Sequence, residues 1–257
     1  MALRFIAGML ALAALTQVSV PRVPQPAQVS ILVYHRFGSM VSDSMTVRTS
    51  TFRWQLQYLR ERRYTVIPLR VLVDSLLHQS PLPAHSVVIT ADDGHESVFT
   101  DMLPAARENA VPVTLFIYPS AISNASYAMT WAQLDALRET GLFDIQSHTY
   151  WHPNFTVEKR RLTAAAYRAF ATEQFCHSKD VLQKKLGVPT DLLAWPFGIH
   201  DNELEDLARG CGYVAAFTLD RRGTGLGANL MALPRFLMTD SAVGTSFASM
   251  LSPEGTQ

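Results

Sequence analysis

Neither sign of charge is in excess in this sequence, since 22 lysine and arginine residues balance 22 aspartate and glutamate residues. A nucleic-acid-binding protein normally carries a basic excess, so this balance argues against nucleic acid as a partner. Charged residues make up only 17% of the 257 residues, whereas hydrophobic residues make up 48%. This composition is typical of a well-buried globular protein and excludes a disordered one.

Long hydrophobic runs are also missing. The apolar run from Phe5 to Leu15 spans eleven residues, which is too short to cross a bilayer and suits the core of a signal peptide. Arg4 precedes it, and a spacer rich in proline follows. We therefore expect residues 1–27 to be a signal peptide and spacer, and the protein to be exported to the periplasm or the extracellular space. In the alternative, the N-terminus is not cleaved and associates the protein with a membrane.

Cysteine is scarce, with only Cys176 and Cys211 in the chain. An exported protein can form a disulfide, but the sequence does not show whether the two residues are close. Two separate buried thiols are an equally open alternative. The cysteines therefore indicate no function by themselves.

Apolar strand-like segments alternate with helix-like segments through the rest of the chain. Strands are expected at 29–34, 64–67, 87–89, 113–118, 142–146, 192–195, 213–219 and 232–238, and the longest helix at 164–186. This alternation predicts a parallel sheet, and seven or eight strands without an obvious break predict a barrel. We expect one α/β domain over residues 28–257, folded as a single (β/α) barrel.

Polar residues cluster where the predicted strands end. They are His35, Asp92, Asp93, Tyr118 and His148, and the aromatic residue Phe197 also follows a predicted strand. The carboxyl ends of barrel strands share one face, where barrel enzymes build their active sites. Asp92 and Asp93 follow a strand expected to be buried, so their charges need partners.

His148 and His152 lie four residues apart, a spacing that lets two imidazoles bind one metal ion on a helical turn or loop. One carboxylate of the Asp pair would complete a two-His, one-Asp set, which is typical of a catalytic metal site. In the structural alternative, the histidines only form hydrogen bonds within a loop. A ferrous oxygenase uses the same donors and is a second enzyme class to consider.

Three motifs together resemble the polysaccharide deacetylases of carbohydrate esterase family 4, also called the NodB-homology domain. Thr90-Ala91-Asp92-Asp93-Gly94 is similar to the family's Thr-Phe-Asp-Asp-Gly motif, and His148-Thr149 with His152 to its second motif. Ala194-Trp195-Pro196-Phe197-Gly198 matches the third motif weakly. The resemblance covers His35 to Arg235 and looks most like the branch that deacetylates poly-N-acetylglucosamine.

The resemblance implies a distorted, TIM-like barrel of the NodB type and a hydrolase that removes N-acetyl groups from an acetylated amino-sugar polysaccharide. It implies that Asp93, His148 and His152 bind a divalent metal, with Zn²⁺ expected, and that Asp92 is the general base. Phe197, with its neighbours Pro196 and Trp195, would contact the substrate, its backbone N–H stabilising the oxyanion. We expect a monomer.

Two departures from the family motifs need substitutes elsewhere in the chain. Ala194 stands where the family has an arginine that orients the base, and Arg235 is our candidate replacement. The family's late histidine, a general acid, is missing, so His35 is the first candidate for that role and His200 the second. The remaining histidines are expected at the surface or in structural positions; they are His78, His85, His95 and His177.

Aromatic residues near the motifs have two interpretations. Trp151, Trp195, Tyr118 and Tyr150 form a sugar-stacking wall or simply pack at the end of the barrel. Two further functions use the same site: an O-acetyl carbohydrate esterase, and a carbohydrate-binding protein whose catalytic site has decayed. Acetate release from each substrate type distinguishes them.

Overall fold

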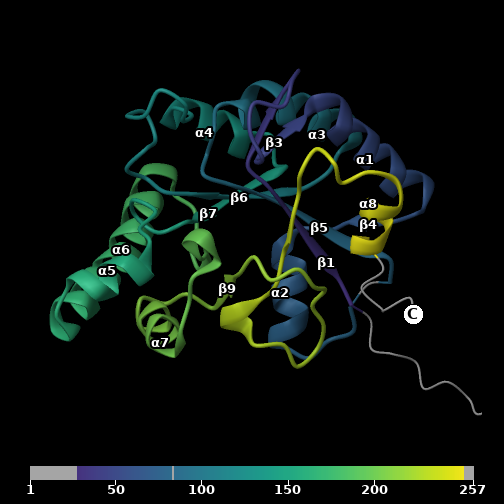
Figure 1. The fold of residues 1–257 in the computed structure, drawn as a ribbon. Coiled ribbons are helices and arrows are strands. Elements are labelled where there is room, and N and C mark those ends of the chain that lie inside the picture. The colour runs from purple at the N-terminus through teal and green to yellow at the C-terminus, as the bar shows by residue number, and fades with distance from the viewer. Residues whose placement is uncertain (1–27, 83, 252–257) are drawn as a thin grey trace, which may run out of the picture.

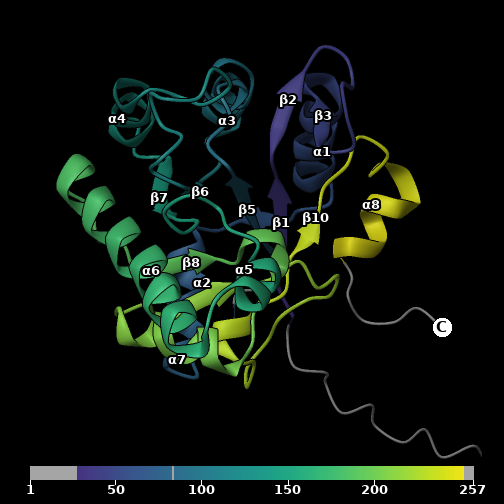
Figure 2. The same cartoon turned by 60° about the vertical axis from the view of Figure 1, so that its left-hand side comes forward.

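A parallel eight-stranded sheet forms the centre of the protein, in a computed structural model that describes residues 28–82 and 84–251. The strands follow the order β10-β1-β5-β6-β7-β8-β9, and β4 pairs with the start of β5 (Figures 1 and 2). Their bounds are β1 Ser30–Tyr34, β4 Thr65–Val66, β5 Ser86–Asp92, β6 Val113–Ile117, β7 Phe143–Ser147, β8 Leu192–Ala194, β9 Ala215–Phe217 and β10 Phe236–Leu237. The prediction of a parallel α/β barrel is confirmed. The expected signal peptide and spacer lie outside the described residues.

The barrel is distorted between β9 and β10, the two strands at the ends of the sheet order. In the described part of the chain no ladder joins β9 to β10, and one isolated parallel bridge, Phe217 to Leu233, spans the gap. The predicted strands at 213–219 and 232–238 are therefore shorter than expected, at three and two residues. Within the described residues each of them forms a ladder with a neighbouring strand along one edge, which explains why they end early.

Helices surround the sheet (Figures 1 and 2). Their bounds are α1 Thr49–Glu61, α2 Leu69–Leu77, α3 Leu103–Asn109, α4 Trp131–Glu139, α5 Phe155–Arg161, α6 Ala164–Leu186, α7 Asn202–Gly210 and α8 Gly244–Leu251. None of the helices in residues 28–82 and 84–251 is long and apolar enough to cross a bilayer. A π-helical turn, Val98–Met102, directly precedes α3. Pro104 then lies in the first turn of α3, where its missing N–H is tolerated.

Successive side chains along the strands belong alternately to two apolar clusters, one on each face of the sheet. Ile31, Val88 and Phe116 belong to a cluster that includes the buried face of α2, whereas Leu32 and Leu115 pack in the larger cluster with other helices. Both faces of β1, β5 and β6 are therefore buried, which explains their unbroken apolar sequences. Polar residues that follow the carboxyl ends of these strands share one face of the barrel.

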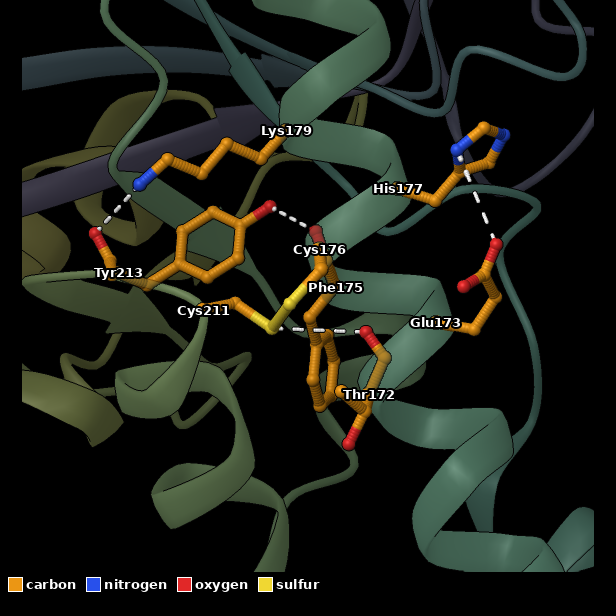
Figure 3. Close-up of a disulfide and its surroundings, with 9 residues drawn as sticks. Thr172, Glu173, Phe175, Cys176, His177, Lys179, Cys211 and Tyr213 are labelled. Atoms are coloured by element: carbon orange, nitrogen blue, oxygen red, sulfur yellow. Dashed lines mark hydrogen bonds and ion pairs between the residues drawn. A yellow bond between two sulfur atoms is a disulfide. The ribbon is translucent and has the colours of Figure 1, made fainter.

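The sequence did not predict some of the short elements. Short strands β2 (Arg36–Gly38) and β3 (Thr46–Arg48) form a separate parallel pair, and α5 and α8 were not predicted. Three-residue strands carry too few residues for an alternating pattern to be recognised. Of the two alternatives for the cysteines, the structure has the disulfide between Cys176 on α6 and Cys211 at the end of α7 (Figure 3).

Candidate active site

Asp93, His148 and His152 converge at the carboxyl ends of β5 and β7. Asp93 Oδ1 lies 3.6 Å from His148 Nε2 and 3.7 Å from His152 Nε2. Within the described residues, these three form the one group of potential metal ligands whose donor atoms all lie within 4.8 Å of one another. The structure thus brings the predicted ligands together, and their role in binding metal stays a prediction.

Unusual backbone conformations produce this convergence. Asp93 has a φ of 72°, and Thr149 and His152 have φ values of 65° and 62°. Left-handed conformations are unfavourable for residues with a Cβ and persist where the surroundings enforce them, commonly at functional sites. Gly94, with φ 73°, lacks a Cβ that would lie 3.0 Å from the Ile117 side chain. The sharp turn after β5 therefore needs glycine at this position.

The imidazole of His148 is oriented by a hydrogen bond on its far side. His148 Nδ1 lies 2.8 Å from the carbonyl oxygen of Ala194, so it carries the proton and donates it there. Nε2 is then unprotonated, and its lone pair faces Asp93. Burial lowers the pKa of His148 to about 3, and burial also lowers the pKa of His152. Both rings are therefore neutral at pH 7, as metal ligands must be.

The environment of the Asp93 carboxylate shows whether these residues suit a divalent cation. Asp93 Oδ1 is buried and has no hydrogen-bond partner among residues 28–82 and 84–251. Burial raises the pKa of Asp93, so its charge is poorly compensated by the protein. A cation bound between this oxygen and the two imidazole nitrogens would satisfy it. Two imidazoles and one carboxylate are the donor set of catalytic zinc sites, so the residues fit a divalent metal ion.

Asp92 is held by Arg235. Arg235 donates from Nη1 to Asp92 Oδ1 at 2.8 Å and from Nη2 to Oδ2 at 2.7 Å, and both side chains are buried. The arginine also donates to the Thr218 carbonyl oxygen and lies over the Phe116 ring. Burial opposes the charge of Asp92, but Arg235, together with His148 and His35, outweighs it and holds the pKa of Asp92 below its usual range. The arginine expected to replace the one missing at Ala194 thus contacts the predicted base.

His35 lies beside the Asp pair because β1 is hydrogen-bonded to β5. Tyr34 is opposite Ala91, so the following residues His35 and Asp92 emerge together at the strand ends. His35 is buried, and its Nδ1 is unpartnered within the described part of the chain. His200, the second candidate, lies instead against the Trp195 ring and pairs with Glu205 at 3.1 Å. The geometry favours His35 as the candidate proton donor.

The third motif places one of its aromatic residues at the site and one in the core. Phe197, with a φ of 56°, is 56% exposed, and its ring centroid lies 4.6 Å from that of His152. Pro196 is buried. Trp195 is fully buried and donates from Nε1 to the Met231 carbonyl oxygen, so its ring offers no face to a sugar. For Trp195, packing is therefore the correct alternative.

A hollow beside Asp93 contains residues that sequence reasoning missed. It has a volume of about 260 Å³ and is lined by Arg36, Asp93, His95, Tyr118 and Tyr127. His95, expected at the surface or in a structural position, accepts a hydrogen bond at Nδ1 from the Ser97 N–H and lies against the Tyr127 ring. Its place two residues after Asp93 was the available signal, but no motif contains Arg36 or Tyr127.

Known proteins are similar to this chain in sequence. The poly-β-1,6-N-acetyl-D-glucosamine N-deacetylase of Escherichia coli K12 is 26% identical over 241 residues, which cover 80% of this chain and 36% of that protein. The Staphylococcus epidermidis protein of the same name is 24% identical over 213 residues, covering 81% and 73%. The chain thus spans about a third of the length of the E. coli relative.

Solved structures share the fold. The Streptococcus pyogenes deacetylase PplD superposes with a TM-score of 0.79 at 21% identity, covering 89% of this chain and all of that one. IcaB from Ammonifex degensii gives 0.78 at 23% identity, covering 88% and 98%. The family model for polysaccharide deacetylases matches residues 79–216, more than half of the sequence. This protein therefore belongs to the polysaccharide deacetylase family.

Proposed function

We propose that this protein is a metal-dependent hydrolase that removes N-acetyl groups from a poly-N-acetylglucosamine-like polysaccharide outside the cytoplasm. The observation that carries the proposal is the meeting of Asp93, His148 and His152 beside the Asp92–Arg235 pair. Two carboxylates in sequence thereby have different environments, and such a difference assigns different roles to neighbouring acids.

The metal site supports hydrolysis of an amide. Asp93, His148 and His152 would hold a divalent cation, with Zn²⁺ the ion that these donors suit. When bound, such a cation supplies Lewis acidity that polarises the acetyl carbonyl and acidifies water. His148 is oriented for this by the Ala194 carbonyl oxygen.

Asp92 acts as the general base. Its carboxylate, kept ionised by Arg235, accepts a proton from the attacking water. The backbone N–H of Phe197 donates to the oxygen of the acetyl group as negative charge develops there. His35 donates a proton to the amine nitrogen as the carbon–nitrogen bond breaks, so that acetate and a free amino sugar leave.

The substrate class is supported by the relatives and by exposed aromatic rings. The E. coli and S. epidermidis relatives are named as poly-β-1,6-N-acetyl-D-glucosamine N-deacetylases. Around the site, Trp151 is 45% exposed and Tyr127 is 40% exposed, in addition to Phe197. Aromatic rings of this kind stack on the apolar faces of sugars. Residues 1–27 are proposed as a signal peptide and spacer, and residues 28–257 as a catalytic domain that acts as a monomer.

Acetate release tests the proposal. Purified protein loaded with Zn²⁺ is incubated with poly-N-acetylglucosamine, chitin oligomers, peptidoglycan and an O-acetylated glycan, and released acetate is measured. We expect release from the N-acetylated polymers, and loss of it in Asp92→Asn but not in Asp135→Asn, which changes an exposed carboxylate on α4. Release only from the O-acetylated glycan would identify an esterase, and glycan binding without release would identify a decayed site.

A further inference from the structure

Ser178, fully buried in the middle of α6, contacts the loop that carries both histidines. Its hydroxyl lies 3.0 Å from the Thr149 carbonyl oxygen and 2.8 Å from Ser147 Oγ, and Ser147 Oγ accepts from the Thr149 N–H. One arrangement of protons satisfies all three contacts. Ser178 donates to the Thr149 carbonyl, and Ser147 donates to Ser178. Both backbone polar groups of Thr149 are thereby fixed.

The backbone bends at Thr149, and this bend brings the imidazoles of His148 and His152 together. Its φ of 65° is unfavourable for a β-branched residue and persists only where its surroundings enforce it. Its side-chain oxygen also accepts from the His152 N–H at 3.1 Å. The bend leaves the rings of His148 and His152 with centroids 4.5 Å apart.

A second contact from α6 supports the same loop. Gln174 Oε1 accepts from the Trp151 N–H at 3.1 Å, and Gln174 is buried. Gln174 and Ser178 are four residues apart, so they lie on one face of the helix. The loop from Ser147 to His152 is therefore held at two points by this face of α6.

The turn of α6 around Ser178 is itself fastened to the segment after α7 (Figure 3). Cys176 is joined to Cys211 by the disulfide, and Lys179 Nζ donates to the Gly212 carbonyl oxygen at 3.0 Å. The hydroxyl of Tyr213 donates to the carbonyl oxygen of Phe175, also at 3.0 Å. Three consecutive residues, 211–213, thus bind residues on both sides of Ser178, and one of the three links is covalent.

We propose that Ser178 is a positioning residue for the metal site, and that the Cys176–Cys211 disulfide holds α6 where Ser178 can act. The inference rests on the proposed function, because it requires the loop to bind a cation. Without the Ser178 hydroxyl, the Thr149 carbonyl loses its donor and the bend relaxes toward ordinary backbone angles. The two imidazoles then separate, and metal affinity falls although no ligand atom has been removed.

The dissociation constant for Zn²⁺, measured by competition with a chromophoric chelator, tests the role of Ser178. Replacing residues that orient metal ligands weakens binding by about 10- to 100-fold, and we expect Ser178→Ala to lie in this range. Ser30→Ala is the matched control, because Ser30 is also buried and its hydroxyl also donates to a backbone carbonyl, that of Met250. We expect Ser30→Ala to lower the melting temperature and leave Zn²⁺ affinity unchanged.

A double variant, Cys176→Ala with Cys211→Ala, tests the disulfide. Couplings through packed networks correspond to about 2- to 30-fold in affinity, and we expect the double variant to bind Zn²⁺ more weakly within this range. Unchanged affinity would overturn the role of the disulfide. Should Ser178→Ala not fold, Ser147→Ala interrupts the same chain of hydrogen bonds and carries the same expectation.

The outcomes separate this inference from the proposed function. Wild-type protein that binds no Zn²⁺ would overturn both. Wild-type protein that binds Zn²⁺ while Ser178→Ala binds it equally tightly would overturn only the positioning role. Equal loss of affinity in Ser178→Ala and Ser30→Ala would also overturn it, since the effect would then follow from general destabilisation.

Discussion

Asp92 and Arg235 lie 143 residues apart in the sequence and form a buried pair with two hydrogen bonds of 2.8 and 2.7 Å. The arginine approaches from the segment before β10, which is hydrogen-bonded to β1, and β1 in turn to β5. Strand order therefore brings a guanidinium to the carboxylate that follows β5. This pair gives the predicted base its charge and its orientation.

Removing Arg235 should both destabilise the protein and alter its pH dependence. Breaking a buried ion pair by deleting one partner costs about 3–5 kcal/mol, because the other charge stays buried. In Arg235→Met the pKa of Asp92 should rise, so the acid limb of the rate–pH profile should move to higher pH. Urea unfolding and kcat/KM from pH 4 to 9 measure the two effects. A variant with an unmoved acid limb would contradict the assignment of Asp92 as the base.

His35 should be needed most where the leaving group is poor. Proton donation by a positioned side chain contributes about 10²- to 10⁴-fold, and an amine must be protonated to leave. His35→Gln should therefore lose activity on the N-acetylated glycan while retaining hydrolysis of 4-nitrophenyl acetate, whose leaving group needs no acid. His200→Gln, which removes the histidine paired with Glu205, should retain both activities. Equal losses on the two substrates would argue against proton donation by His35.

Glycine at position 94 should be required for the geometry of Asp93. In Gly94→Ala the new methyl would meet the Ile117 side chain at 3.0 Å, in addition to the strain of φ 73°. Displacing Asp93 by about 1 Å can reduce activity about 10²-fold. Gly187→Ala provides the control, since φ there is 65° and no heavy atom of the described residues lies within 4 Å. Both variants should lose stability, and only Gly94→Ala should lose activity and Zn²⁺ binding.

Asp240 should stabilise the protein in a pH-dependent manner. It accepts hydrogen bonds from the backbone and side chain of Arg48 and from Thr51, at the start of α1. The side-chain hydrogen bond from Arg48 is the main cause that lowers the pKa of Asp240 to about 2. A lowered carboxyl pKa stabilises the folded state above the unfolded pKa of about 3.9, and this contribution disappears as the pH falls toward 2.

The comparison of wild-type protein with Asp240→Asn measures this contribution. At pH 7 the variant should be less stable by about 1 kcal/mol, as expected for a partly exposed pair. The difference in unfolding free energy should shrink below pH 4. Asp220→Asn, at the exposed and looser pair with Arg222, should show no such difference. If the difference in unfolding free energy between the wild type and Asp240→Asn persists at pH 2, this explanation is ruled out.

Some features of the fold follow from local sequence, and others do not. Helix α6 has the predicted bounds because Thr163 caps its first turn and Gly187 adopts the left-handed conformation that ends it. The spacing of His148 and His152 likewise predicted that their two imidazoles lie close together. Such signals lie within a few residues of one another and need no knowledge of neighbouring strands.

Other parts of the site depend on contacts between distant segments. Arg36 and Tyr127 reach the hollow beside Asp93 through the pairing of β2 with β3 and the bridge from His95 to Ala128. The hydroxyl of Ser178 meets the histidine loop only because α6 packs along β7. No local sequence pattern predicts these contacts, since each residue alone is compatible with an ordinary surface or core position.

The number of Zn²⁺ ions bound per chain, measured by equilibrium dialysis and elemental analysis, tests the central claim most directly. We predict one ion per chain in the wild-type protein and a loss of that ion in Asp93→Ala, His148→Ala and His152→Ala. Asp92→Asn, which leaves the three donor atoms in place, should keep the ion while losing acetate release. Retention of the ion in the three ligand variants, or its absence from the wild type, would contradict the account.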